Sequence, residues 1–421
     1  GSGVRINDSS AVGNLAFGAR FLNTSGSGIA RTQLTGNIGG GLGLFNASNF
    51  TVEACNLSGN TGAGLFASAS TLSASLSDFS SNSQDGVVLT NGTRFDGSAL
   101  VLESNTREGL WARGGSLNLS GATVRLNGFN GTLAVGASLN LTDGLFERNG
   151  RYGVFFSANA TGGWLVLSTA WLAHNPAVLS GGVRVTGGYF QLLNATVDLQ
   201  DAPAAPFLFD VSAAGTLALD NATLRAAGSS DRFSIQLGSG SLLSGASSRL
   251  ESPGRGMLAA LSGSSCQVDL SGVQVVDAYA PFAVAGCPVR LTDVSFTGAR
   301  GDVLALFLGS TLDALRLTID GAAGSGILAN GSQADIRSSS LLNIGWDAVA
   351  GNSADLNLTD SVIVGAFNRG IAVVGGRLTA LNVSVEGGAY GVEGTDAVIS
   401  GRLVFVSSTG GAGLKVAGGS S

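Results

Sequence analysis

The residues that could do acid–base or nucleophilic chemistry are few and widely spaced. His174 is the only histidine, so a Ser-His-Asp constellation has little support. Asp96, Glu103, Asp143 and Glu147 each lack an acidic residue about 22 positions away, and we interpret the carboxylates as single groups. Glycoside cleavage needs two carboxyl groups flanking the bond. Two carboxyl groups from different strands could still lie close together in the fold, but no catalytic residue is predicted.

Other chemical signatures are also missing from the sequence. Glu103 and Glu147 lie 22 residues on either side of Arg125, which indicates a surface charge ladder. No Cys/His spacing typical of zinc occurs, and no Gly-Gly-X-Gly-X-Asp calcium repeat. Phosphate-binding glycine loops need a following helix, whereas the glycines here fit turns. We therefore predict no metal site and no cofactor.

A repeat of about 22 residues organises the chain, and such repeats indicate a solenoid. A glycine lies four residues after each repeating asparagine and an apolar residue three before, at least from residue 37 to residue 153. The repeating asparagines are Asn37, Asn60, Asn82, Asn105, Asn127, Asn149 and Asn175. Stacked asparagines can hydrogen-bond along a fibre or solenoid axis, and asparagine tolerates the left-handed conformation that a corner can require. We interpret them as a structural ladder.

Each repeat, or rung, contains short apolar segments separated by small turns. Examples are Gly-Val-Phe-Phe (153–156), Ser-Leu-Asn-Leu-Ser (116–120) and Thr-Val-Arg-Leu (123–126). Segments this short, with alternating polarity, favour strands over helices. Parallel crossovers are right-handed. The prediction is an all-β, single-stranded right-handed parallel β-helix of about 17–18 rungs, with three short strands per rung.

The repeat is uneven along the chain. Rungs are regular over 38–175, looser over 176–320 and regular again over 321–421, where Gly326, Ala348, Gly370, Gly391 and Gly413 continue the glycine position. We predict one continuous β-helix over 1–421. Neither end shows a capping helix or polar rung, and open ends expose unpaired strands. A segment of a longer protein, or end-to-end stacking, is therefore expected.

The composition excludes several classes of partner. Only 12% of residues are charged, the net charge is −6 and no Lys/Arg cluster occurs, so nucleic acid binding is not expected. No run of 18 apolar residues is present, so the chain is not membrane-spanning.

Two cysteines begin similar five-residue segments, Cys-Gln-Val-Asp-Leu from Cys266 and Cys-Pro-Val-Arg-Leu from Cys287. Equivalent positions in adjacent rungs lie roughly 4.8 Å apart, within reach of a disulfide. We predict a Cys266–Cys287 disulfide and hence an oxidising compartment. The alternative is a pair of stacked reduced thiols. Cys55 is expected to pack inward.

Asn-X-Ser/Thr sequons occur at fifteen of the 26 asparagines, but at none of the ladder positions. Many have an apolar residue on either side, so they should point outward if those neighbours point inward. The glycosylation candidates are Asn56, Asn118, Asn140, Asn194, Asn221, Asn357 and Asn382. Glycans on a secreted protein and ordinary polar outward residues explain them equally well.

A second apolar residue lies two positions after the glycine in five successive rungs: Phe66, Val88, Trp111, Leu133 and Phe155. If the residue after the glycine points inward, this row faces outward and forms a possible contact face for a protein partner or a sugar. The alternative is that a longer loop covers it, or that the alternation is displaced by one residue.

The rungs Asn-Thr-Gly-Ala-Gly-Leu (60–65), Asn-Ser-Gln-Asp-Gly-Val (82–87), Asn-Thr-Arg-Glu-Gly-Leu (105–110) and Asn-Gly-Arg-Tyr-Gly-Val (149–154) resemble the parallel β-helix repeat of the pectate-lyase-like superfamily. That superfamily includes lyases, hydrolases, tailspikes, adhesins and inert surface rods. The Asn-Thr-Asp, Asp-Asp, Gly-His-Gly and Arg-Ile-Lys motifs of its pectin hydrolases do not occur here. No acid cluster like that of its calcium-dependent lyases was found.

The resemblance and the missing motifs favour a non-enzymatic, extracellular or cell-surface structural or adhesive solenoid. Its expected partners are other copies or segments of a surface assembly, or surface glycans. The alternative is a polysaccharide-active enzyme, a lyase or glycoside hydrolase, or a carbohydrate-binding module of the same fold.

Overall fold

The computed structural model describes residues 3–157, 164–168, 171–173, 183–199, 209–226, 233–251, 256–260, 265–279 and 281–418. All regular secondary structure in these residues is β-strand, which confirms the predicted all-β class. The chain divides into two compact units, unit 1 (residues 1–210) and unit 2 (residues 211–421). A single continuous β-helix over 1–421 stays a prediction.

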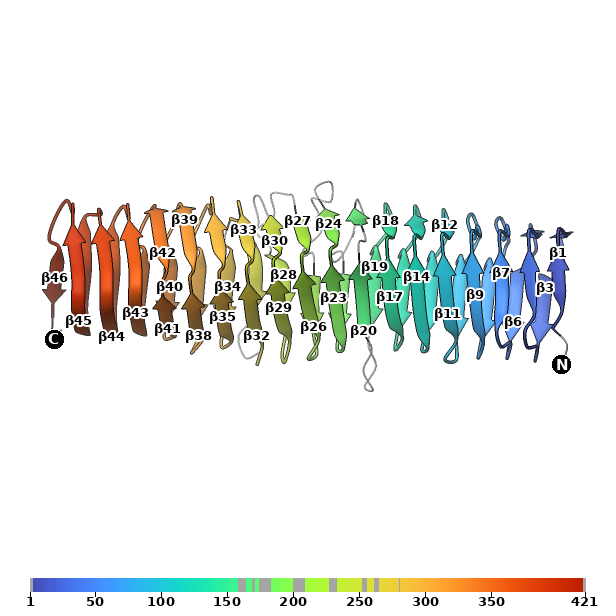
Figure 1. Cartoon of the computed structure of the whole chain (residues 1–421), viewed down its shortest axis with the longest axis horizontal. Coiled ribbons are helices and arrows are strands. Elements are labelled where there is room, and N and C mark those ends of the chain that lie inside the picture. The colour runs from blue at the N-terminus through green and yellow to red at the C-terminus, as the bar shows by residue number, and fades with distance from the viewer. Residues whose placement is uncertain are drawn as a thin grey trace. The chain divides into compact units, whose positions relative to one another are not determined.

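Strands of unit 1 pair in parallel with the equivalent strand of the next rung and form three stacks, here named A, B and C (Figure 1). Stack A contains β3 (Phe17–Leu22), β6 (Gly40–Phe45), β8 (Leu65–Ser68), β10 (Val87–Thr90), β13 (Leu110–Arg113), β16 (Thr132–Val135), β19 (Val154–Ser157) and β22 (Val183–Thr186). Stack B contains β1 (Arg5–Asn7), β4 (Gly28–Ala30), β7 (Phe50–Glu53), β9 (Thr71–Ser75), β11 (Arg94–Ser98), β14 (Ser116–Ser120), β17 (Ser138–Thr142), β20 (Trp164–Ser168) and β23 (Tyr189–Leu193).

Stack C of unit 1 has the shortest strands. It contains β2 (Ser10–Val12), β5 (Gln33–Thr35), β12 (Val101–Glu103), β15 (Thr123–Arg125), β18 (Leu145–Glu147), β21 (Trp171–Ala173) and β24 (Thr196–Leu199). Single bridges through Asn56 and Asp78 connect β5 to β12. Each rung therefore visits C, A and B in turn, as the three-strand prediction requires.

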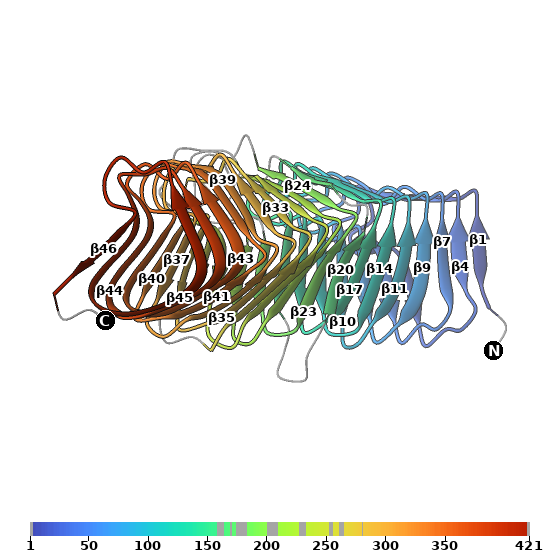
Figure 2. The same ribbon diagram turned by 60° about the vertical axis from the view of Figure 1, so that its left-hand side comes forward.

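Unit 2 repeats the same three stacks (Figure 2). Stack A contains β25 (Phe209–Ser212), β28 (Phe233–Leu237), β31 (Gly256–Ala260), β34 (Phe282–Ala285), β37 (Leu304–Phe307), β40 (Ile327–Asn330) and β46 (Leu414–Ala417). Stack B contains β26 (Thr216–Asp220), β29 (Leu242–Ala246), β32 (Gln267–Ser271), β35 (Pro288–Thr292), β38 (Thr311–Leu315) and β41 (Gln333–Arg337). Stack C contains β27 (Thr223–Ala226), β30 (Arg249–Glu251), β33 (Gln274–Val276), β36 (Ser295–Thr297), β39 (Thr318–Ala322) and β42 (Ser340–Ile344).

The last rungs of unit 2 differ from the prediction of short strands. β43 (Val349–Val364), β44 (Arg369–Glu386) and β45 (Tyr390–Ser407) are 16, 18 and 18 residues long. Each runs through all three stacks, because its pairing with the next rung continues around both intervening corners.

Alternation of side chains builds the core of each rung. In β8 the side chains of Leu65 and Ala67 are fully buried, whereas Phe66 and Ser68 are partly exposed. Phenylalanines such as Phe79 and Phe146 fill the interior of unit 1. Burial of such side chains stabilises each by roughly 1.5–3 kcal/mol, and stacking repeats the gain in every rung.

The glycine column, Gly41, Gly64, Gly86, Gly109 and Gly131, is required by close approach of neighbouring rungs. A Cβ on Gly109 would lie 2.6 Å from the carbonyl oxygen of Gly131 and 2.8 Å from Asn127 Nδ2. Similar contacts, 2.5–2.7 Å from the next glycine oxygen, occur at the other four. Any side chain would push the rungs apart, because both obstacles are packed, hydrogen-bonded groups.

The asparagine ladder is a buried chain of hydrogen bonds in unit 1. Asn105 Nδ2 donates to Asn127 Oδ1 at 3.0 Å, and the same oxygen accepts the backbone N–H of Asn105 at 3.1 Å. The ladder side chains from Asn37 to Asn149 are at most 1% exposed. Each carboxamide thus satisfies two donors of the preceding rung, which would otherwise be buried without partners.

Two details of the ladder differ from the sequence interpretation. It begins one rung earlier, because Asn14 Nδ2 donates to Asn37 Oδ1 at 2.7 Å. The suggested left-handed conformation of the asparagines is wrong. It belongs instead to the residue before each, for example Ser104 (φ 58°) and Leu126 (φ 56°). The chain reverses there, which leaves the asparagine free to point inward. Asn175 lies outside the described residues.

Candidate functional site

The predicted contact face of unit 1, Phe66, Val88, Trp111, Leu133 and Phe155, is one row on the outward side of stack A. Register pairs each residue with the next, from Phe66 with Val88 to Leu133 with Phe155. Val88 is 4% exposed between its larger neighbours, and the other four are partly exposed. The residues after the glycines, such as Leu65 and Leu110, are fully buried.

Further aromatic groups continue the contact face toward the first rungs. The Phe45 ring centroid lies 5.4 Å from that of Phe66 and 6.3 Å from that of Phe17. The Arg20 guanidinium lies over the Phe45 ring at 4.8 Å. At the far end of the row, Tyr152 packs edge-on against Phe155 at 5.3 Å. This apolar surface therefore carries a cation at one end.

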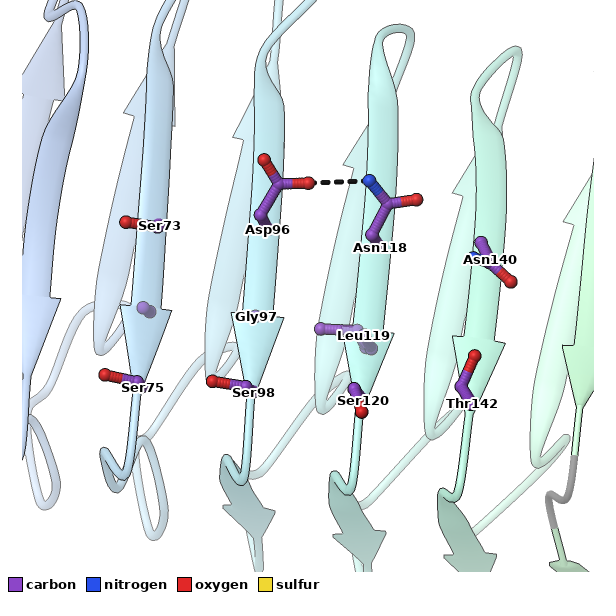
Figure 3. A pocket seen from close by; sticks show the side chains of 11 residues that line it. Ser73, Ser75, Asp96, Gly97, Ser98, Asn118, Leu119, Ser120, Asn140 and Thr142 are labelled. Atoms are coloured by element: carbon purple, nitrogen blue, oxygen red, sulfur yellow. Dashed lines mark hydrogen bonds between the residues drawn. The ribbon is translucent and has the colours of Figure 1, made fainter.

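A polar depression of about 320 Å³ lies on the outward side of stack B in unit 1 (Figure 3). Asp96 and Asn118 line it on neighbouring strands, and Asn118 Nδ2 donates to Asp96 Oδ1 at 2.6 Å. Asn140 follows one rung on. The hydroxyl groups on its rim belong to Ser73, Ser75, Ser98, Ser120 and Thr142. It offers amides and hydroxyls at rung spacing, and its one carboxylate is already hydrogen-bonded.

The glycosylation candidates are all at least partly exposed, in contrast to the buried ladder asparagines. Asn118, Asn140 and Asn357 lie on stack B strands with an inward leucine on either side. Asn194, Asn221 and Asn382 instead occupy left-handed corner positions, with φ of 49°, 49° and 53°. Asn56 forms an isolated bridge.

Local structure explains why these sequons are common. On stack B, the alternation outward–inward–outward produces Asn-Leu-Ser or Asn-Leu-Thr. At the corner before stack C, a left-handed residue favours asparagine, and the outward residue two positions later favours a β-former such as threonine. Several of these amides donate to the preceding rung, as Asn357 Nδ2 does to Asp335 Oδ1 at 3.2 Å. The high frequency of sequons is therefore explained by the fold as well as by glycosylation.

The structure pairs Cys266 with Cys287 in a disulfide of unit 2, with Cα atoms 5.2 Å apart. Both are 1% exposed, at the corner between stacks A and B. Neighbouring rungs place Ser241 and Ser310 at the same position, and Ser310 Oγ donates to the Phe307 carbonyl at 2.7 Å. The cysteines thus replace two hydroxyls of a corner column. Cys55 is a buried free thiol, and burial raises its pKa.

The interpretation of the carboxylates as single groups is wrong at two places. In unit 2, Asp313 pairs in register with Asp335 on the outward side of stack B, and Arg337 contacts both. In unit 1 the pair is buried. Asp85 and Glu108, 23 residues apart, occupy the position before the glycine column in successive rungs, and they are 1% and 7% exposed. We call them the carboxyl pair. Asp85 Oδ1 accepts the backbone N–H of Glu108 at 3.2 Å. The same position carries Asn130 and Tyr152 in the next rungs, so no common residue type marked the column in the sequence.

The carboxyl pair faces little positive charge. Arg107 Nε lies 3.9 Å from Asp85 Oδ1 and 3.7 Å from Glu108 Oε2, and its side chain is 47% exposed. Glu108 Oε1 accepts from Asn130 Nδ2 at 3.5 Å, while Oε2 has no hydrogen-bond partner. Burial, and then the closeness and negative charge of Asp85, raise the pKa of Glu108 to about 7, although Arg107 opposes the rise.

The chemistry open to this pair is proton exchange near neutral pH. Glycosidases hold their two carboxyl groups roughly 5–9.5 Å apart to flank a sugar bond. Asp85 Oδ1 instead accepts the backbone N–H of Glu108 at 3.2 Å, and both side chains are buried, so the pair does not flank an open space for a sugar bond. Among the described residues, no three His, Cys, Asp or Glu side chains converge as metal ligands.

The corresponding position in unit 2 carries opposite charges. Asp347 and Arg369 occupy successive rungs there, and Arg369 binds Asp347 through Nε at 2.9 Å and Nη2 at 2.7 Å. Arg369 Nη1 also donates to Glu393 Oε2 at 3.1 Å, and Lys415 Nζ lies 2.6 Å from Glu393 Oε1. This chain of charges is fully paired.

The remaining predicted residues have structural placements only. Arg125 lies 3.1 Å from Glu103 and 3.8 Å from Glu147, as a charge ladder on the outward side of stack C. His174 lies outside the described residues. None of the described residues forms a helix able to cross a lipid bilayer.

Two comparisons with known proteins found similarities. The family model described as a right-handed β-helix region matches residues 1–129. The chain is similar to the solved structure of a PL6 family alginate lyase, AlyGC, with 9% sequence identity and a TM-score of 0.31 over 99% of this chain and 96% of that one. No curated protein sequence matches it. Parallel pairing of equivalent strands in each unit, together with the family match over residues 1–129, shows that the fold is a right-handed parallel β-helix.

Proposed function

We propose that the protein is a non-catalytic structural or adhesive solenoid of an extracellular or cell-surface assembly, and that unit 1 binds its partner through the contact face. The observation that carries this proposal is the partly exposed apolar row on stack A, which includes Phe66, Trp111, Leu133 and Phe155. Large aromatic side chains dominate binding energy in protein interfaces. Exposed rows of this length are uncommon on surfaces without a partner.

Rigidity also supports an adhesive or structural role. The rungs that carry the contact face are held by strand pairing, by the asparagine ladder and by the glycine column, so the contact face is ordered before a partner arrives. A surface that does not have to be ordered on binding loses less conformational entropy.

The contact face can be tested with the double variant Trp111→Gln/Leu133→Gln. We expect the wild-type protein to bind in a glycan array or to self-associate in sedimentation velocity, and the variant to lose at least about tenfold in that affinity. Ser116→Gln/Ser138→Gln, two outward residues of stack B, is the control. An interaction that the double variant leaves unchanged would contradict the assignment of this face.

Secretion is the second part of the proposal, supported by the Cys266–Cys287 disulfide and the exposed sequons. Intact mass and glycopeptide mapping of natively purified, unreduced protein test it. We expect a linked Cys266–Cys287 peptide and glycans on Asn118, Asn140 and Asn357. Free thiols together with a bare polypeptide would remove the support for an extracellular location.

One observation favours the alternative of a polysaccharide-active protein. Glu108, with its pKa raised to about 7, lies three residues before Trp111, so a proton donor is close to an aromatic surface that could stack on a sugar. Incubation with a panel of acidic and neutral polysaccharides tests this alternative. Cleavage by the wild type that Glu108→Gln abolishes would establish it, and an absence of cleavage across the panel would leave the structural role.

A further inference from the structure

The carboxyl pair is the one place in the described residues where two acidic side chains are buried against each other. Asp85 and Glu108 are held in successive rungs by strand pairing, and they cannot separate without disturbing the corner between stacks C and A. Burial of two adjacent carboxylates in a low-dielectric site is strongly unfavourable, so such pairs retain a proton.

Charge counting at the corner supports one retained proton. On the preceding rung the pair meets the apolar Ala63, and on the following rung the neutral Asn130. Tyr152 lies one rung farther on. The facing cation among the described residues is Arg107, whose Nε approaches both carboxyl groups only to 3.7–3.9 Å. One proton retained by the pair makes the cluster with Arg107 neutral.

The orientation of the hydrogen bonds indicates which group holds the proton. Asp85 Oδ1 accepts the Glu108 backbone N–H, an interaction that favours a charged aspartate. Glu108 Oε2 is buried without a hydrogen-bond partner, so this side chain gains least from being charged.

We propose that the carboxyl pair retains one proton, held by Glu108, and that loss of this proton at alkaline pH drives the Glu108 side chain out into solvent. We call the buried, singly protonated pair at this corner the clasp. The two carboxylates then repel each other, and Glu108 is the one with room to move, because it is more exposed than Asp85.

The clasp lies next to the contact face on the same two rungs. Val88 follows Asp85 by three residues, and Trp111 follows Glu108 by three residues. Opening of the corner would loosen the first residues of β10 and β13, so partner binding is expected to weaken at alkaline pH. This consequence rests on the proposed function of the contact face, whereas the clasp itself does not.

The proton can be observed directly in the intact wild-type protein. The chain has seven glutamates, so glutamate-selective ¹³C labelling gives a spectrum simple enough to follow with pH. We expect one side-chain carboxyl resonance to titrate near pH 7 and to be missing from Glu108→Gln. A Glu108 resonance that titrates near the ordinary glutamate value of 4.5 would overturn the proposal.

Variants separate the clasp from a merely structural role of the side chain. Glu108→Gln keeps the size but cannot ionise, so its thermal midpoint should match wild type at pH 5 and exceed it at pH 8.5. Asp85→Asn should move the Glu108 titration to lower pH, because the negative charge of Asp85 is lost. Glu103→Gln, in the same rung but paired with Arg125 at 3.1 Å, is the control and should leave the pH dependence unchanged.

The outcomes distinguish the clasp from the contact face. Identical pH profiles of wild type and Glu108→Gln would exclude the clasp, whatever the contact face binds. A normal clasp titration with pH-independent partner binding would retain the clasp and exclude its regulatory role. If Glu108→Gln fails to fold, the titration of the wild-type resonance decides.

Discussion

The corner between stacks C and A is built in two different ways in the two units. In unit 1 the buried corner residue is an asparagine, as at Asn82 and Asn105, with its side chain bonded to the neighbouring rungs. In unit 2 the same position holds Ala322, Ile344 and Ala366, which are equally buried. A left-handed residue precedes the corner in both units, for example Ser104 and Gly321.

The two corners share their backbone geometry. In unit 1 the N–H of Thr106 donates to the Asn82 carbonyl at 2.9 Å, and in unit 2 the N–H of Gly345 donates to the Ala322 carbonyl at 2.6 Å. What differs is how the corner residue itself is satisfied. Asn82 N–H bonds to a side chain, Asn105 Oδ1, whereas Ala322 pairs with Ile344 through the backbone, because β39 and β42 extend to the corner. The fold therefore does not require asparagine at this corner. Even after the three-residue strands β33 and β36 the buried corner residue is an alanine, Ala278 or Ala299.

The largest expected effect comes from exchanging the two corners. Asn105→Ala removes three hydrogen bonds, including the acceptor for Asn82 N–H, and leaves buried donors unpaired. We expect a loss of roughly 3–4 kcal/mol in the free energy of unfolding, measured by urea denaturation.

The reciprocal variant, Ala322→Asn, buries an amide between Ala299 and Ile344, whose side chains have no polar atom to bond to it. It should cost roughly 1–3 kcal/mol rather than stabilise unit 2. For the first variant, Asn105→Ala, a loss below about 1 kcal/mol would show that water or neighbouring carbonyl groups replace the hydrogen bonds of the asparagine ladder.

The second prediction concerns the charges beside the corner. Arg369→Gln leaves Asp347, 2% exposed, without its bidentate partner. We expect a loss of roughly 2–3 kcal/mol, because removal of one member of a buried ion pair leaves an uncompensated charge. Asp347→Asn/Arg369→Gln should recover part of this loss. If the double variant is no more stable than Arg369→Gln, the charge on Asp347 is not the cause.

Much of this organisation could be predicted from the sequence, but only where a column keeps one residue type. The asparagine ladder and the glycine column recur at steps of 22 or 23, and the hydrogen bonds of Asn37 and Asn60 follow from that register. Asn14 carries the same signal, with Gly18 four residues later, and could have been recognised. The left-handed position before each asparagine varies from glycine to leucine and arginine, so the conformation was assigned to the wrong residue.

The carboxyl pair could not be recognised by residue type. Its column runs from Ala63 through Asp85, Glu108 and Asn130 to Tyr152, and only register shows that these positions stack. Nor does alternation predict their burial, because they lie in a turn and not on a strand. The side chains are buried by the corner of the adjacent rung, which is a property of the assembled solenoid.

The third prediction links the glycine column to the ladder. Gly109→Ala should cost about 2 kcal/mol, because the added Cβ meets both Gly131 O and Asn127 Nδ2. Unit 2 tolerates Ala348 in the equivalent position, where the following corner residue is Ala366 and no amide is present. In an Asn127→Ala background, Gly109→Ala should therefore cost less. Equal costs in both backgrounds would assign the whole penalty to the backbone contact.

The smallest effect is a pH dependence of opposite sign in the two units. The pKa of Glu108 is raised above its ordinary value of 4.5 to about 7, so its stabilising contribution is complete below pH 4.5 and is lost as the pH rises through 7. The pKa of Glu393 is lowered, first by its hydrogen bond with Lys415, so its contribution is present above pH 4.5 and is lost as the pH falls through the lowered pKa.

Hydrogen exchange resolves the two units separately. After correction for intrinsic exchange rates, peptides covering 82–110 should exchange faster at pH 8.5 than at pH 5. The free energy of local opening should fall by roughly 1–2 kcal/mol, less than the full pKa shift of Glu108 implies, because solvent screens part of the interaction. Peptides covering 390–415 should show no such loss over this range and should open only in more acidic solution. Glu108→Gln should abolish the first effect and leave the second. If peptides from both units begin to exchange faster at the same pH, the pH dependence arises from the total charge of the protein and not from the difference between the two corners.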